Sequence, residues 1–139
     1  MPEEPTTPDL AQRVRDAFQA TDPADLDQVM SFYAPGAVWE VIGLGTVMEG
    51  AQAIRAFLEE WTSAYEEFRI DIEEILELGA GVTFAVLVQS GRPVGSTERI
   101  RYRFAQLATW VDGVVVRIVG YTDIDEARAA AERLAEERG

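Results

Sequence analysis

Apolar residues recur at helical spacing in three stretches of the first half of the chain. The first stretch begins near Thr7, with Pro8 in its first turn, and the second begins at Asp22-Pro23, a capping side chain followed by proline. The third stretch covers residues 50–65. We predict a helix in each, the second ending at "APGA", residues 34–37. The apolar stripes are Leu10, Val14, Ala17 and Phe18; Leu26, Val29, Met30 and Tyr33; and Ile54, Phe57, Leu58, Trp61 and Tyr65.

In the second half the apolar spacing falls from about 3.6 residues to about 2, which predicts strands. A short strand at 37–42 comes before these. The predicted strands of the second half are 67–78, 82–89, 98–111 and 114–122. Asp112-Gly113 is a strong hairpin signal, and "SGRPVGS" after the second of them reads as a loop. Asp123 with Glu126 resembles a capping box, which predicts a final helix over 124–137.

The stretch "VWEVIGLGTVMEG", residues 38–50, has the outline of a strand, a glycine-rich turn and a helix. Gly43 and Gly45 fit a dinucleotide fingerprint, but Met48 occupies the third glycine position. Glu49 would lie near the helix N-terminus and would repel a pyrophosphate there. The stretch is therefore interpreted as a flexible arm between the first strand and the third helix, not as a nucleotide site.

The predicted order is α-α-β-α-β-β-β-β-α, and its segregated helices and strands favour the α+β class. Three segments, "DLDQVMSFYAPGAVWEVIGLG", "EGAQAIRAFLEEW" and "WVDGVVVRIVGYTD", resemble the SnoaL-like branch of the nuclear transport factor 2-like superfamily. The resemblance implies a cone-shaped, strongly curved antiparallel sheet wrapped by three N-terminal and central helices. It also implies an apolar small-molecule pocket at the open end of the cone, and pairing as dimers. We predict one such domain over 9–137, after a flexible N-terminal arm at 1–8.

Composition removes several classes of function. The 139 residues carry a net charge of −13, which disfavours nucleic acid and anionic membranes as partners. The sequence contains no histidine, cysteine or lysine. Triads, thiol chemistry, Schiff bases and histidine-ligated metals are therefore excluded, and we expect neither a metal nor a cofactor. The N-terminus lacks the pattern of a secretory signal and no apolar run is long enough to span a membrane, so a cytoplasmic location is expected.

Strand parity sorts the side chains into two faces. Arg99, Arg101 and Arg103 share one face, which must point outward because three arginines inside would be very costly. In the last strand Arg117 marks the same outer face, together with Val115, Val119 and Tyr121, while Val116, Ile118 and Gly120 would face inward. The outer face is either solvated, its arginines paired with acids, or a homodimer surface. The predicted dimer residues are Arg101, Arg103, Arg117, Val119 and Tyr121.

The inner face predicts the ligand site. Tyr102 and Gln106 interrupt the apolar inner face of 98–111, and Gln89 faces inward if the family register holds. Each of these polar side chains could instead be an ordinary core residue, and the same holds for Trp39 and Trp61. The predicted ligand-binding residues are Trp39, Val41, Trp61, Leu87, Gln89, Tyr102, Gln106 and Ile118.

The resemblance also locates the catalytic groups of the relatives, and this chain lacks them. Ketosteroid isomerases use an aspartate base, a tyrosine and a protonated aspartate; these positions fall on Val41, near Ala17 and near Gln106. Limonene-epoxide hydrolases use an arginine and two aspartates, at positions that fall on Leu87, Gln89 and Gly120. The aspartate of SnoaL-type polyketide cyclases also aligns with Gly120.

Three hypotheses follow. The first is a small-molecule-binding domain with an apolar pocket, which could act as a cyclase or isomerase on a hydrophobic metabolite. The second is a non-enzymatic module for dimerisation or partner docking. The third is an enzyme of epoxide-hydrolase or isomerase type that uses Glu74, or Glu40, as acid or base. Glu74 shares the parity of Ile72, but a bulge at Glu73-Glu74 would turn it outward.

Overall fold

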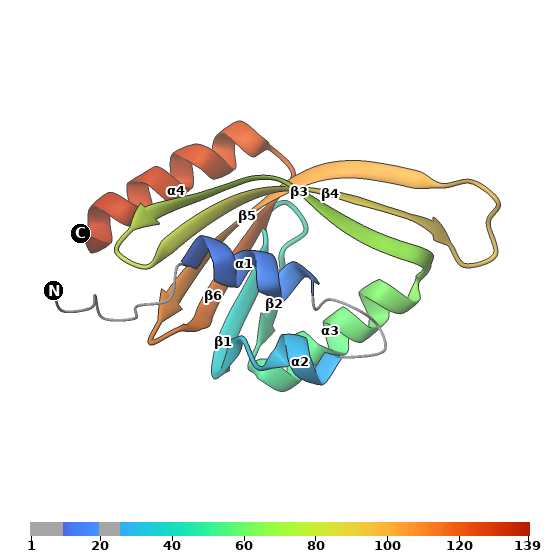
Figure 1. Cartoon of the computed structure of the whole chain (residues 1–139), viewed down its shortest axis with the longest axis horizontal. Coiled ribbons are helices and arrows are strands. Elements are labelled where there is room, and N and C mark those ends of the chain that lie inside the picture. The colour runs from blue at the N-terminus through green and yellow to red at the C-terminus, as the bar shows by residue number, and fades with distance from the viewer. Residues whose placement is uncertain (1–9, 20–25) are drawn as a thin grey trace, which may run out of the picture.

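A six-stranded, strongly curved sheet forms the centre of the molecule, in a computed structural model that describes residues 10–19 and 26–139 (Figure 1). The strand order is β2-β1-β6-β5-β4-β3, and all neighbours are antiparallel except β1 and β6. The strands are β1 (Tyr33–Val41), β2 (Thr46–Glu49), β3 (Tyr65–Gly79), β4 (Val82–Pro93), β5 (Ile100–Val111) and β6 (Val114–Tyr121). The helices are α1 (Leu10–Gln19), α2 (Leu26–Met30), α3 (Ala51–Ser63) and α4 (Ile124–Arg138). The predicted α+β class is confirmed, whereas the predicted arm at 1–8 and the Asp22-Pro23 helix start lie outside the described residues.

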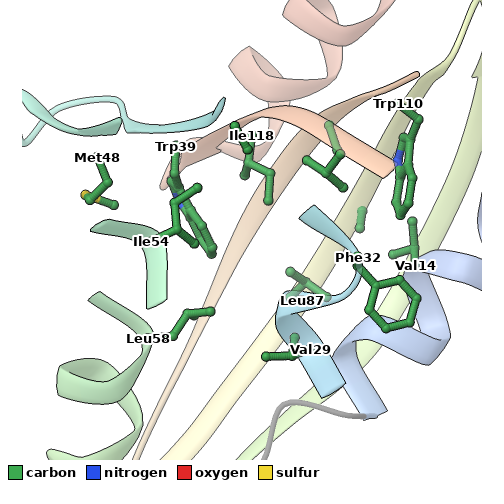
Figure 2. Packing of buried hydrophobic residues seen from close by; sticks show 14 of the residues in the cluster. Val14, Val29, Phe32, Trp39, Met48, Ile54, Leu58, Leu87, Trp110 and Ile118 are labelled. Carbon is green, nitrogen blue, oxygen red and sulfur yellow. The ribbon is translucent and has the colours of Figure 1, made fainter. Parts of the chain in front are cut away.

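Helices cover both faces of the sheet. The first three helices pack on the concave inner face, and α4 crosses the outer face (Figure 1). The inner core joins Val14, Val29 and Ile54 of these helices to sheet residues such as Trp39 and Ile118 (Figure 2). The outer core lies between the sheet and the small side chains of α4, of which Ala127 and Ala131 are fully buried.

Two turn predictions are confirmed in detail. Asp112 and Gly113 both have positive φ, 53° and 84°, as a type I′ hairpin turn requires. The Asp123 side chain accepts a hydrogen bond from the Glu126 backbone N–H at 3.0 Å, so it caps α4 at its N-terminus. The Asp112-Gly113 turn fixes the β5–β6 hairpin, and the Asp123 cap begins the helix that leads the chain from β6 onto the outer face.

The glycine-rich stretch forms a β-hairpin. Gly43 and Gly45, both at positive φ, lie in the turn between β1 and β2, and Gly50 then begins α3. The predicted arm therefore contains an edge strand, β2, that the sequence reading missed. The first strand also starts earlier than predicted, because Tyr33 pairs with Val115 of β6 instead of ending the second helix.

Strand parity holds for the arginines and fails at two irregularities. Arg99 and Arg103 pair with Glu67 and Glu73 on the outer face, both at 2.9 Å. Between β5 and β6 the register passes from Thr109–Arg117 to Trp110–Val115, which leaves Val116 as the extra residue of a bulge. Val115 consequently faces the inner core, and Val116 lines the outer groove beneath α4, the reverse of the predicted orientation.

A second irregularity in β3 decides the position of Glu74. Ile72 pairs with Leu87 and Glu74 with Val86, so Glu73 is the extra residue. Glu74 therefore points outward, where its carboxylate accepts two hydrogen bonds from Arg128 of α4, at 2.9 and 3.1 Å. Of the two predicted orientations of Glu74, the structure thus has the outward one that a bulge at Glu73-Glu74 produces, which keeps Glu74 away from the inner wall.

Candidate functional site

A cavity of about 300 Å³ lies on the inner face of the sheet, between α3, the β1–β2 hairpin and the strands β5 and β6. Aromatic rings form most of its wall. The aromatic lining residues are Trp39, Phe57, Trp61, Tyr65, Tyr102, Phe104 and Tyr121. The remaining lining residues are Val41, Leu44, Thr46, Gln106, Gly120 and Thr122. The cavity is therefore a neutral, largely apolar space whose sides come from distant parts of the chain.

The aromatic wall is a connected set of rings centred on Trp61. Phe57 stacks on Trp61 with ring centres 5.7 Å apart, and Trp39 meets the edge of Phe57 at 5.3 Å. Phe104 approaches Trp61 from the sheet at 6.1 Å. These are the offset and edge-to-face arrangements that aromatic pairs prefer, so the wall is held in one geometry.

Behind this wall, Gln89 holds Trp61 in place. The Trp61 indole Nε1 donates a hydrogen bond to Gln89 Oε1 at 3.0 Å. The other amide atom, Gln89 Nε2, is fully enclosed and has no hydrogen-bond partner among the described residues. Gln89 thus faces inward, as the family register predicted, but it lies behind the cavity wall and not in it.

The polar end of the cavity is at Gly120. Gly120 pairs with Gln106 of β5 on one side and with Val41 of β1 on the other. A Cβ added at Gly120 would lie 3.8 Å from Trp39 Nε1 and 3.9 Å from the Glu40 carbonyl oxygen, so the missing side chain leaves a gap beside the indole, with Gln106 directly opposite on β5. Trp39 and Gln106, from the strands on either side of Gly120, both line the cavity.

Of the predicted ligand-binding residues, the structure brings five together in the lining: Trp39, Val41, Trp61, Tyr102 and Gln106. Leu87 is fully buried in the inner core. Ile118 borders a smaller space of about 40 Å³, which residues of α1 and α2 also line. Sequence reasoning missed Phe57, Tyr65 and Phe104, although all three lie on predicted inner or apolar faces. Leu44 and Thr46 could not be placed, because nothing in the pattern predicts the hairpin that carries them.

Charged side chains stay outside the cavity, since none of the described residues that line it is acidic or basic. Glu40 pairs with Arg117 on the outer face at 2.6 Å. Glu74 is hydrogen-bonded to Arg128, which holds the pKa of Glu74 below its ordinary value. Tyr102 is 44% exposed, and its partial burial, followed by the neighbouring Tyr65, raises its pKa, so this hydroxyl keeps its proton. In the described part of the chain, no group of three or more acidic side chains is placed to hold a metal ion.

On the outer face, α4 covers part of the predicted dimer surface. Val119 is only 6% exposed beneath the helix, and Tyr121 and Arg117 border a groove of about 410 Å³ between α4 and the sheet. Arg101 and Arg103 lie beyond the helix and are exposed. None of the described helices is both long and apolar enough to cross a membrane.

Comparison with known proteins identifies the family. The model of the SnoaL-like domain matches residues 13–118. A candidate SnoaL-like polyketide cyclase from Jannaschia sp. shares the fold at a TM-score of 0.71 and 16% identity, covering 94% of this chain and 98% of that one. No curated protein sequence matches the chain.

Two further structures with this fold were solved with small organic molecules. One is a protein of ketosteroid isomerase-like fold from Catenulispora acidiphila in complex with trimethylamine, with a TM-score of 0.69, 17% identity and coverage of 91% and 94% of the two chains. The other is TerC co-crystallised with polyporic acid, with a TM-score of 0.68, 18% identity and coverage of 88% and 96%. At these identities the likeness establishes the fold alone.

Proposed function

The chain belongs to the SnoaL-like domain family, and we propose that it binds an uncharged, largely apolar small molecule in the cavity beside Trp61. The observation that supports this most is the lining itself, which is aromatic and aliphatic and carries no charge. A volume of about 300 Å³ is within the range of ligand pockets, about 300–1,000 Å³. Apolar surface buried there would contribute about 25 cal/mol per Å². Solved relatives that hold polyporic acid and trimethylamine support a ligand-binding use of the fold.

The test compares one substitution at two positions. Val41→Phe places a ring into the cavity, whereas Val47→Phe adds the same ring at a site that is 50% exposed and outside the lining. Calorimetric titration with isopropylnaphthalene, an apolar probe, should give saturable binding to the unmodified protein and to Val47→Phe, and none to Val41→Phe. Equal binding by both variants, or no binding to the unmodified protein, would reject the proposal.

A second candidate is a cyclase or isomerase that acts on such a ligand. The family relationship and the ring-lined cavity favour it, because orienting a reactive substrate alone can lower a barrier substantially. Acid–base help would have to come from tyrosine hydroxyls such as that of Tyr102, since no carboxylate of the described residues borders the cavity. Mass spectrometry of candidate substrates incubated with the protein tests this, and turnover that survives in Val41→Phe would place the activity elsewhere.

Pairing into a homodimer through the outer face stays a proposal, and α4 changes its expected position. Since Val119 is buried under the helix, the free part of the face is the ion-paired region around Arg101 and Arg103. Arg101→Glu should weaken association there, because it replaces an exposed cation without touching a described ion pair. Sedimentation velocity should then show dimer converting to monomer, and a monomer at all concentrations before substitution would exclude the dimer.

A further inference from the structure

We propose that Trp39 and Gln106 form a subsite for one uncharged oxygen of the ligand, a carbonyl or hydroxyl group, which occupies the gap that Gly120 leaves between them. This inference rests on the proposed function and makes it more specific. It predicts a ligand with an apolar ring body and a single neutral oxygen function directed toward β6, and it predicts discrimination against carboxylates.

The first observation is an unused donor. Trp39 is only 4% exposed, yet its Nε1–H makes no hydrogen bond to any described residue. The two other indoles behave differently, since Trp61 Nε1 donates to Gln89 and Trp110 Nε1 donates to Thr83 Oγ1, both at 3.0 Å. A buried indole N–H usually has a partner. Trp39 lines the cavity, and its Nε1 is not among the fully enclosed atoms without a partner, so water can meet this N–H in the free protein and a bound molecule can replace that water.

The second observation is an unused carboxamide on the neighbouring strand. Gln106 is 7% exposed and lines the cavity, and its side chain makes no hydrogen bond to the described part of the chain. Its position directly opposite Gly120 puts its Cβ about 4.5–5.5 Å from where a side chain at 120 would begin. Two polar side chains that lack a hydrogen-bond partner among the described residues, each more than nine-tenths buried, thus line the same cavity from the strands on either side of Gly120.

The chemistry of the two groups selects the ligand oxygen. An indole N–H can only donate, and a carboxamide can donate or accept. A carbonyl oxygen can accept from both, while a hydroxyl can accept from Trp39 and donate to Gln106. A carboxylate would lose its hydration without meeting a cation, because none of the lining residues in 10–19 and 26–139 is basic. The subsite therefore favours a neutral oxygen over both hydrocarbon and carboxylate.

Three naphthalene probes with equal numbers of non-hydrogen atoms test this: acetylnaphthalene, isopropylnaphthalene and naphthoate. Because its oxygen can form hydrogen bonds that the hydrocarbon cannot, the ketone should bind roughly tenfold more tightly than the hydrocarbon, and naphthoate should bind most weakly. Trp39→Phe and Gln106→Met remove the polar atoms while keeping much of the bulk. Each should reduce the preference for the ketone several-fold and leave hydrocarbon affinity nearly unchanged. Gln106→Met tests the subsite even if Trp39→Phe fails to fold.

A spectroscopic measurement separates this role from a structural one. In proton–nitrogen correlation spectra of the unmodified protein, acetylnaphthalene should move the Trp39 indole N–H signal downfield relative to isopropylnaphthalene. The Trp110 indole signal should stay fixed, because that N–H is already bonded to Thr83. If both probes bind with equal affinity and equal Trp39 shifts, the oxygen subsite is wrong while the apolar cavity stands. If neither binds, the proposed function fails as well.

Discussion

Gly120→Ala should stabilise the protein while it impairs ligand binding, and these two effects can be calculated separately. Gly120 is buried, its φ lies outside the left-handed region, and the nearest atoms to a new Cβ are Trp39 Nε1 at 3.8 Å and the Glu40 carbonyl oxygen at 3.9 Å. Both are ordinary contact distances. Replacing a glycine within a strand gains about 0.5–1 kcal/mol, and the buried methyl group adds up to about 0.8 kcal/mol. The free energy of unfolding should therefore rise by about 1 kcal/mol.

For 139 residues, about 1 kcal/mol corresponds to a rise in Tm of roughly 3–4 °C, which urea and thermal unfolding can both resolve. The same methyl group occupies the gap between Trp39 and Gln106, so affinity for acetylnaphthalene should fall at least tenfold. The control is Gly81→Ala, where φ is +78° and a Cβ would lie 2.6 Å from the Trp110 carbonyl oxygen. That variant should lose roughly 2–4 kcal/mol. Loss of stability in Gly120→Ala, or unchanged ketone affinity, would refute the description of this gap.

Two further predictions concern stability. Thr83→Val keeps the side-chain shape but removes the acceptor of the buried Trp110 indole, so it should cost about 1–3 kcal/mol in urea unfolding; a cost near zero would mean that Trp110 is satisfied elsewhere. Glu74 has a folded-state pKa below its ordinary value of 4.5, so the unfolded chain takes up the proton first and stability falls as the pH drops through that range. Glu74→Gln should flatten this acid limb of the stability curve, and an unchanged limb would contradict the Arg128 pairing.

Turn chemistry and strand polarity were readable from the sequence because they depend on neighbouring residues. Asp112-Gly113 requires positive φ at two adjacent positions, and the arginines of β5 cannot face an apolar interior, so both features follow from local rules. The α+β class followed in the same way from the change of spacing between the two halves of the chain.

The features that were missed depend on residues far apart in the chain. Strand β2 has only four residues and forms because β1 offers an edge, which no pattern within 46–49 reveals. The packing of α4 on the outer face depends on alanines, whose small side chains give a weak apolar stripe. The sequence predicted this helix but not its packing, so Val119 was placed on an open surface, whereas it is buried in the structure. The lining residues Leu44, in the β1–β2 turn, and Thr46, at the start of β2, were missed because that hairpin was not predicted.

The bulge at Glu73 explains how one strand serves two cores. Before it, Ile70 and Ile72 of β3 point to the inner core; after it, Leu76 and Leu78 point to the outer core beneath α4. An unbroken alternation would have put these leucines and Glu74 on the inner wall and left α4 without apolar partners on this strand. The extra residue therefore supplies the outer core and, in the same step, moves a carboxylate from the inner face to Arg128. One local irregularity thus keeps Glu74 off the inner face and adds two leucines of β3 to the outer core beneath α4.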